Sequence, residues 1–501
     1  MLEKLLKEST PEHSCFDGDW LLDYKKIELK CGLEIHRQLN TRHKLFCNCS
    51  TMMQEKEPIK IIMRKQHPVQ SELGEVDVTA QYEFLRNRTF NYQIFSREDC
   101  LVECDEEPVH PLNQEALEIA LQIALMLNCR IPDEVQIMRK TVIDGSNTSA
   151  FQRTAVIGLD GCIEYKGKKI EVTYVSLEED AASIVDEKNG NVTYRLNRLG
   201  IPLVEIGTGV LIGYSPEEVQ EIAYLIGMIY RSTGKVKRGI GSVRQDVNVS
   251  IKNGARVEIK GIQELGLLSK VIELEVQRQL SLPEVKEETR TANPDGTTRF
   301  IRPLPGGARM YVETDILPIL IETKTIQGIK KSLPEPWTKK LVRFKERLRL
   351  SDELSKQILG SDYLDLFENI IKKFNVNPSV VANVFVSILK DLRKREGALV
   401  ENLNDEDFEE LFRLLDKGKI VKESIADVLL YKSKNPDISI EDCVKKLDLG
   451  TITEKELRQI VKDVVKMNRD KPVEKVIGIV MSKVRGKVRS EDVVKTVKKE
   501  F

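Results

Sequence analysis

The order of strand-like and helix-like segments is the feature that most constrains the fold of this chain. From about residue 26 to residue 321, β-branched runs alternate with only two strong helical patterns, at Gln114–Leu127 and after Ser215-Pro216-Glu217-Glu218. A doubly wound parallel sheet needs a helix after nearly every strand, and this region does not supply one. We therefore expect an α+β domain with a mainly antiparallel sheet.

The strand candidates share apolar, β-branched residues at alternating positions. The second helix has defined ends, because Ser215 and Glu218 form a capping box, Pro216 takes the first helical position and Gly234 stops the helix. The five strand candidates are Val135–Val142, Lys169–Val175, Val192–Leu196, Val243–Ile251 and Arg256–Lys260.

After Leu333-Pro334-Glu335-Pro336 the chain changes to helical segments separated by short polar stops. Thr453 and Glu456 form another capping box, and Gly418 and Gly450 lie where helices should end. We expect three domains: a sheet domain over residues 1–330, a helical domain over residues 331–436 and a small helical tail over residues 437–501.

The composition indicates a cytoplasmic protein. The chain has no run of about 18 apolar residues that could span a membrane, and its charged start, Met1–Ser14, has no apolar segment typical of a secretory signal. Eight of the nine cysteines precede residue 163 without a regular disulfide spacing. This distribution favours thiols or a metal site over a disulfide framework.

Carboxylates and one histidine predict a magnesium site. Glu34 and His36 are two residues apart in a strand-like segment, so their side chains should share one face. Glu178 and Asp180 belong to a run of three acids, and Glu205 follows in another apolar segment. Acids so close repel one another unless a cation lies among them, and one imidazole with several carboxylates suits Mg²⁺. The alternative is a set of exposed or salt-bridged residues.

Four cysteines form a second candidate metal site with a C-x-C and a C-x3-C spacing. Four thiolates suit tetrahedral zinc, which would join two loops. The alternative is four ordinary buried cysteines, and His67 or His110 could replace one thiolate. The four residues are Cys47, Cys49, Cys100 and Cys104.

A glycine turn offers a place for phosphate. Gly239 and Gly241 precede a strand that carries Arg244 and Asp246 on one face. Such glycines let backbone N–H groups approach a phosphate, although a hairpin turn with a surface ion pair is the simpler interpretation. The sequence has neither a Walker loop nor a dinucleotide fingerprint, so any use of ATP requires another architecture.

Two further segments each permit two interpretations. The polar run from Asp144 to Arg153 could line a substrate groove or conduit, or it could be a plain surface loop. The region from Lys471 to Phe501 has nine Lys/Arg residues against four Asp/Glu residues. It could bind an RNA backbone or be a solvated face. The basic residues at its centre are Lys483, Arg485, Lys487 and Arg489.

Long segments spread in order over nearly the whole chain resemble one family, the B/E subunits of the tRNA-dependent amidotransferases. Within this family the chain is most similar to the E subunits of the archaeal glutamyl-tRNA(Gln) amidotransferases. The segments include Gly32–His36, Leu39–Thr41, Asp144–Ser149, Leu177–Ala181, Arg198–Ile206, Gly241–Asn248 and Val257–Gly261.

The resemblance implies an ATP-dependent ligase. Glutamate misacylated on tRNA(Gln) would be phosphorylated on its side chain and then amidated by ammonia, with ATP and Mg²⁺ as cofactors. His36, Glu178 and Glu205 match the magnesium-binding positions, and Glu34 completes the catalytic set. The positions implied for ATP or phosphate contacts are Asp180, Arg244, Asp246 and Lys260.

The resemblance also implies a cradle-shaped catalytic domain, a helical domain and a tail that binds tRNA(Gln). Ammonia would come from a partner, the asparaginase-like D subunit, in a heterodimer or heterotetramer. E subunits carry an inserted domain related to aspartyl-tRNA synthetase, but here only Ser281 to Lys286 occupies that place. The alternative function is a non-catalytic, zinc-containing subunit that binds tRNA or serves as a scaffold.

Overall fold

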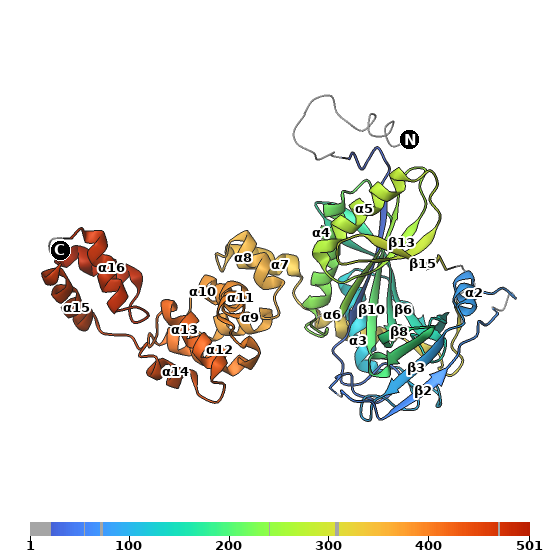
Figure 1. Cartoon of the computed structure of the whole chain (residues 1–501), viewed down its shortest axis with the longest axis horizontal. Coiled ribbons are helices and arrows are strands. Elements are labelled where there is room, and N and C mark those ends of the chain that lie inside the picture. Colours follow the sequence, from blue (N-terminus) through green and yellow to red (C-terminus); the bar gives the residue numbers. More distant parts are fainter. Residues whose placement is uncertain (1–21, 55, 71–73, 240, 306–309, 469–470) are drawn as a thin grey trace. The chain divides into compact units, whose positions relative to one another are not determined.

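The computed structural model describes residues 22–501 apart from residues 55, 71–73, 240, 306–309 and 469–470. The chain forms two compact units, Met1–Pro336 and Trp337–Phe501 (Figure 1). The first contains a large sheet and the second only helices, as the sequence predicts. None of the described helices is both long enough and apolar enough to span a membrane.

The first unit is built on an eleven-stranded sheet with the order β15-β14-β13-β12-β1-β10-β7-β6-β5-β16, and β11 pairs with β1. Among its described pairs, only β13 and β14 run parallel, so the predicted antiparallel sheet is confirmed. All five strand candidates lie in strands of this unit. The strands of the eleven-stranded sheet are β1 (Lys30–Gln38), β5 (Ile137–Thr141), β6 (Phe151–Tyr165), β7 (Lys168–Glu179), β10 (Pro202–Thr208), β11 (Leu211–Ile212), β12 (Val243–Ser250), β13 (Val257–Ile262), β14 (Glu288–Ala292), β15 (Thr298–Pro303) and β16 (Met310–Val312).

Two smaller sheets complete this unit. One joins β2 (Lys60–Arg64), β3 (Thr89–Ile94), β9 (Asn191–Arg195) and β8 (Ser183–Lys188), and β3 runs parallel to β9. Its apolar face includes the stacked rings of Tyr92 and Tyr194. The other pairs β4 (Glu134–Val135) with β17 (Ile319–Leu320), and a short helix, α2 (Val78–Leu85), contacts β15.

Three helices pack against one face of the large sheet: α3 (Gln114–Met126), α4 (Pro216–Ser232) and α5 (Leu268–Ser281). Facing them, alternate residues of β1, including Leu33 and Ile35, are buried. The capping box of Ser215 is present, and Gly234 takes a left-handed conformation just after α4. Since this face is covered by helices, functional polar residues of the sheet must lie on the other face.

Helix α3 approaches the sheet closely because two glycines of β6 have no side chain. A Cβ atom on Gly158 would lie 2.8 Å from the Cβ atoms of Ala124 and Cys129, and one on Gly161 would lie 2.4 Å from the Cys129 sulfur. These glycines therefore set the distance between α3 and the sheet.

The second unit contains short helices, most of them separated by short loops. A π-helical segment, Val384–Ile388, joins α10 directly to α11. Thr453 forms the predicted capping box of α15, and Gly418 is left-handed after α12. Gly450 is not a helix stop, because Asp448 takes the left-handed position after α14 instead, a conformation that Asp tolerates. The helices are α7 (Trp337–Glu346), α8 (Asp352–Leu359), α9 (Leu364–Lys373), α10 (Pro378–Asn383), α11 (Leu389–Glu396), α12 (Asp405–Asp416), α13 (Ile425–Lys434), α14 (Ile440–Lys446), α15 (Glu454–Met467), α16 (Val473–Lys483) and α17 (Ser490–Glu500).

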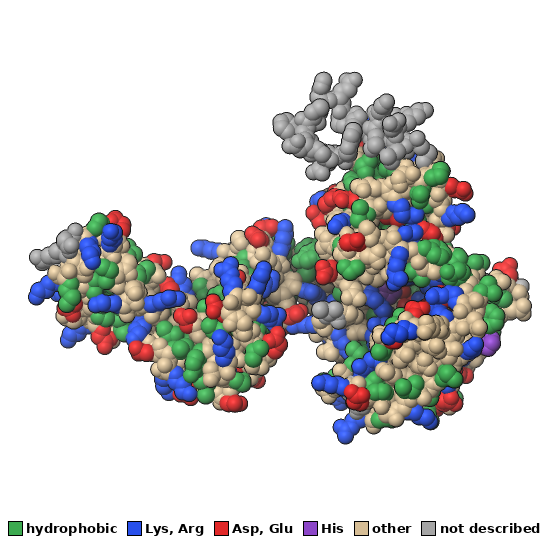
Figure 2. Space-filling model, in the orientation of Figure 1, with side chains coloured by type: hydrophobic (Ala, Val, Ile, Leu, Met, Phe, Trp, Pro, Cys, Tyr) green, Lys and Arg blue, Asp and Glu red, His purple; other side chains and the backbone are tan. Residues whose placement is uncertain are grey.

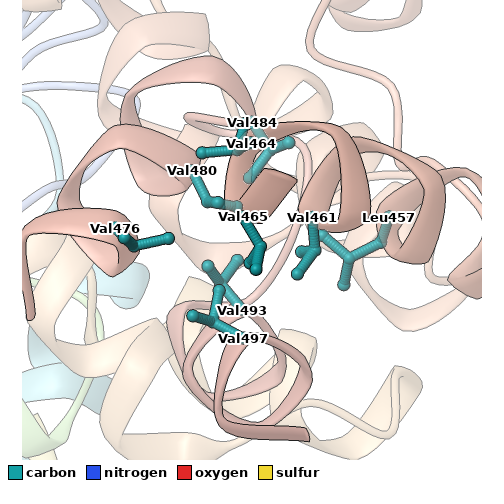
Figure 3. Packing of buried hydrophobic residues seen from close by; sticks show 9 residues of the cluster. All are labelled: Leu457, Val461, Val464, Val465, Val476, Val480, Val484, Val493 and Val497. Atoms are coloured by element: carbon teal, nitrogen blue, oxygen red, sulfur yellow. The ribbon is translucent and has the colours of Figure 1, made fainter. Parts of the chain in front are cut away.

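The last three helices share a core of their own. Figure 3 shows valines of α15, α16 and α17, among them Val461, Val480 and Val493, pointing toward one another. The division of this unit at residue 436 stays a prediction. The first unit extends to Pro336 rather than residue 330, because α6 (Thr323–Lys331) packs against α3.

We predict opposite effects of alanine at two glycines. Gly158→Ala should lower the free energy of unfolding by about 1–3 kcal/mol, because the new methyl group overlaps α3. Gly227→Ala, in the middle of α4 with no neighbouring atom within 4 Å, should raise it by about 0.5–1 kcal/mol through helix propensity. Urea denaturation of both variants measures these free energies of unfolding. Equal denaturation midpoints for the two variants would contradict the steric argument.

Candidate active site

The register of β1 with its two neighbours gathers charged side chains on the open face of the sheet. His36 lies opposite Glu205 of β10 and opposite Arg244 of β12, and Glu34 lies opposite Asp246. Residues at the same register position of neighbouring strands point to the same face. Pairing alone therefore brings residues from three distant parts of the sequence together.

His36, Glu178 and Glu205 form the first candidate metal site. Their ligand atoms all lie within 4.8 Å of one another, and His36 Nε2 is 3.4 Å from Glu205 Oε2. His36 Nδ1 is buried and has no hydrogen-bond partner among the described residues. One imidazole and two carboxylates with ligand atoms this close together fit a divalent cation.

The electrostatics of this trio also fit a cation. Burial alone would raise the pKa of Glu205, but the charge and hydrogen bond of His36 hold that pKa well below its usual range. Burial lowers the pKa of His36. The negative charges of Glu205, Asp246 and Glu178 outweigh this effect, so the pKa of His36 is raised. Positive charge is therefore favoured here, whether from a proton on His36 or from a metal ion that replaces it.

A second acidic group lies beside the first. Ligand atoms of Glu34, Asp246 and Glu258 lie within 4.8 Å of one another. Lys260 Nζ donates to Asp246 at 3.0 Å and contacts Glu258 at 2.6 Å, and Asn248 donates to Glu34 at 3.2 Å. Burial, followed by repulsion from the neighbouring carboxylates, raises the pKa of Glu34 to about 7 against the attraction of Lys260.

A pocket of about 450 Å³ opens over both acidic groups. Its walls include Glu34, Glu178, Glu205 and Glu258, and Lys140 contributes an ammonium group. Lys140 Nζ lies 2.8 Å from Glu178 Oε1. The volume lies within the range of small-molecule sites, so the pocket can hold the reacting ends of two substrates beside bound cations.

Asp180 and Arg244 contact each other, and neither residue belongs to the two acidic groups beside this pocket. Arg244 Nη2 donates to Asp180 Oδ1 at 2.7 Å, and Gln38 donates to the other oxygen at 2.5 Å. Gly239 and Gly241 both have positive φ, as a glycine turn requires, and Ile240 between them lies outside the described residues. The ion pair is buried on the Asp180 side, so it is not the surface pair of the simpler interpretation.

Three of the four candidate zinc ligands come together. Cys47, Cys49 and Cys100 group with Glu103, with ligand atoms within 4.8 Å. Glu103 accepts from the Cys100 N–H and from the Cys47 thiol, both at 2.8 Å. Cys104 is not in this group, because its side chain packs into the apolar core under the four-stranded sheet. The predicted set of four cysteines is therefore corrected at this position.

The two histidines considered as substitutes also lie elsewhere. His67 contacts the ring of Phe84, and His110 pairs with Glu107. No sequence pattern pointed to Lys44, which is fully buried beneath the cysteines with its Nζ 3.1 Å from Asp99 and 3.4 Å from Glu103.

The run after Asp144 is buried or partly buried throughout, so it is not a plain surface loop. Tyr92 and Tyr194 donate hydrogen bonds to the carbonyls of Gly145 and Asp144, each at 2.9 Å. Asn147 and Thr148 are buried and line a small polar pocket with neighbouring residues. The segment lines a small polar pocket, and its role as a substrate groove or conduit stays a prediction.

The basic turn between α16 and α17 packs against the preceding helical region. A Cβ atom on Gly486 would lie 2.6 Å from Leu449, and Lys487 pairs with Asp448. Lys483, Arg485 and Arg489 are exposed or partly exposed, and Lys and Arg side chains are spread over the visible face of these helices (Figure 2).

Pocket residues that the sequence did not single out lie two positions apart on the strands already identified. Counting back from Glu178 along β7 leads to Ser176 and Tyr174, and both line the pocket. Lys140 of β5 and Thr154 of β6 both contact Glu178 Oε1. The alternation of side chains every two residues along a strand could have indicated these residues. Using that alternation also required knowing the order of the strands in the sheet.

Comparisons with known proteins agree with this architecture. Residues 29–327 match the family described as GatB/GatE catalytic domain, and residues 365–501 match the one described as GatB domain. The chain is similar to proteins named as E subunits of glutamyl-tRNA(Gln) amidotransferase. It is 36% identical to the one from Methanocaldococcus jannaschii, covering 93% of this chain and 97% of the relative. The proteins from Saccharolobus solfataricus and Aeropyrum pernix are each 35% identical, covering 93% of this chain and 96% of the relative.

These relatives contain residues without a counterpart here. The alignment with the Methanocaldococcus protein spans 613 positions, whereas this chain has 501 residues. More than one hundred positions of that alignment are therefore unmatched in this chain. This difference agrees with the missing insertion expected between α5 and β14.

Proposed function

Because this chain belongs to the E-subunit family of the glutamyl-tRNA(Gln) amidotransferases, whose catalytic domain is of the GatB/GatE type, we propose that its pocket converts Glu-tRNA(Gln) to Gln-tRNA(Gln). The glutamyl carboxylate attacks the γ-phosphorus of ATP, which releases ADP and leaves an acyl phosphate. Ammonia then attacks the acyl carbon, and phosphate leaves. A carboxylate is a poor acceptor for ammonia, so the first step supplies the leaving group.

The observation that carries this proposal is the grouping of His36, Glu178 and Glu205, of which Glu178 and Glu205 line the pocket. We assign these three residues as ligands of Mg²⁺. A bound magnesium ion would neutralise the charge that develops on the transferring phosphoryl oxygens. Hydrogen bonds from Thr154 and Lys140 to Glu178 hold that carboxylate in place.

The second acidic group supports the nucleotide end of the reaction. We propose that Glu34, with Asp246 beside it, interacts with cations that accompany ATP, and that Lys260 keeps this group from repelling the phosphates. The partly exposed Arg244 pairs with the buried Asp180 beside this group. Arg244 contributes positive charge toward the triphosphate.

The relatives are named as subunits, and we propose that this chain works in a hetero-oligomer with an asparaginase-like D subunit. That partner releases ammonia, and this chain consumes it. The cytoplasm, where charged tRNA and ATP are available, is the proposed location. A non-catalytic tRNA-binding or scaffold role is the competing function.

The first test is amidation by the chain itself. With [14C]Glu-tRNA(Gln), ATP, Mg²⁺ and ammonium, we expect Gln-tRNA(Gln) to form, and Glu178→Gln should reduce the rate by roughly 100-fold or more through loss of a metal ligand. Glu164→Gln, which changes an exposed glutamate of β6, should leave the rate unchanged.

The same assay with the asparaginase-like partner added distinguishes the competing function. Product only in the presence of that partner would mean that the partner completes the pocket. Bound tRNA without ATP consumption in either case would favour the scaffold role.

We propose that the cysteine group binds a structural zinc ion. The purified chain should contain about one equivalent of zinc, and Cys100→Ser should lose it and unfold more readily. Cys104→Ser should keep the metal because that side chain packs in an apolar core. Metal analysis of both variants decides the point, and zinc loss in Cys104→Ser would restore the four-cysteine set.

We propose that the basic turn of the tail binds the backbone of tRNA(Gln). Changing Lys483, Arg485 and Arg489 together to alanine should weaken binding and reduce the slope of log K against log salt by up to about three. Lys487 should contribute less because Asp448 already pairs with it. The matched control changes Arg393, Lys394 and Arg395 of α11, and equal salt slopes for the two triple variants would refute the proposal.

A further inference from the structure

The side chain of Tyr174 lines the pocket and contacts a proposed metal ligand. Tyr174 of β7 donates its hydroxyl hydrogen to Glu205 Oε1 at 2.6 Å. The other oxygen, Glu205 Oε2, faces His36 Nε2 at 3.4 Å. The two oxygens of Glu205 are therefore divided between a protein donor and the metal site.

The position of the Tyr174 ring depends on a glycine in the neighbouring strand, where no side chain occupies the space of the ring. Gly207 is the register partner of Tyr174 and lies two residues after Glu205 on β10. A Cβ atom on Gly207 would lie 2.4 Å from Tyr174 Cε1 and 2.6 Å from Cζ. The ring thus lies over Gly207 and reaches along β10 to the carboxylate. Any other residue at position 207 would move the ring.

We propose that Tyr174 is a positioning residue for the metal ligand Glu205, and that Gly207 provides the space for its ring. This inference rests on the proposed magnesium site of His36, Glu178 and Glu205. The phenol fixes the carboxylate plane and leaves Oε2 free to bind the cation. Partners of this kind tune metal affinity by about 10–100-fold.

The chemistry of the phenol suits this role. A phenol carries its hydroxyl hydrogen at neutral pH, so Tyr174 can donate to the Glu205 carboxylate. A permanent donor orients the carboxylate without competing for the cation.

The test is direct binding of Mn²⁺ to the full-length chain, followed by the electron paramagnetic resonance signal of the free ion. Mn²⁺ prefers the same hard oxygen and imidazole ligands. Tyr174→Phe keeps the ring and removes only the hydroxyl, and should raise the Kd for Mn²⁺ by about 10–100-fold. The matched control is Tyr165→Phe, which removes an equally short hydrogen bond of 2.6 Å to Glu221 outside the pocket.

Kinetics separate positioning from a general loss of structure. In amidation assays, Tyr174→Phe should raise the Mg²⁺ concentration needed for half-maximal rate, while kcat at saturating Mg²⁺ stays near that of the unchanged protein. A Kd for Mn²⁺ within about twofold of the unchanged protein would overturn the inference, since partners of metal ligands have larger effects.

A second variant tests the role of Gly207 separately from the assignment of Glu205 as a metal ligand. Gly207→Ala should weaken Mn²⁺ binding in the Tyr174 protein but add little in the Tyr174→Phe protein, where no hydroxyl remains to be displaced. Additive losses would overturn the role of Gly207. Binding of Mn²⁺ that is unchanged in Glu205→Gln would overturn the metal assignment itself, which is a different result from unchanged binding in Tyr174→Phe alone.

Discussion

The pairing of β1 with β10 and β12 is the interaction on which the rest of the structure depends. Side chains alternate between two faces of a strand, so a shift of one residue would turn Glu34 and His36 toward the helices and Leu33 and Ile35 toward the pocket. Tyr230 of α4 opposes such a shift, because its hydroxyl contacts the carbonyls of Ile35 and Val204 at 2.7 and 3.0 Å. One side chain of α4 thereby stabilises the register in which β1 and β10 pair.

The pocket combines many carboxylates with few compensating charges. Five acids, from Glu34 to Glu258, converge on the open face, and Lys140, Lys260 and His36 are the cations among the described residues that contact them directly. In a partly dehydrated pocket this repulsion is costly. Ligands that bring positive charge would relieve this repulsion, as the proposed phosphoryl transfer with Mg²⁺ requires.

Local sequence patterns predicted the strands and the capped helices, because strand periodicity and capping act over a few residues. The choice of His36, Glu178 and Glu205 as magnesium ligands came from the resemblance to the family and stays a prediction. Lys140 and Tyr174 were not predicted because their role depends on β5, β6, β7 and β10 being neighbours in a particular order. Cys104 shows a different limit: spacing placed it with the thiols, whereas its side chain turns into an apolar core. Gly450 shows the same limit, since Asp448 ended the helix first.

The connection from α5 to β14 has a consequence for how such proteins change over time. It runs from the end of a helix at Ser281 to the start of a strand at Glu288, and β14 pairs parallel to β13 while β12 pairs with β13 on its other side. Residues 283, 284, 286 and 287 are exposed. A junction whose two ends are already anchored in the fold tolerates the gain or loss of a whole module. A loop at this junction can therefore lengthen or shorten without disturbing the pairing of β13 with β14.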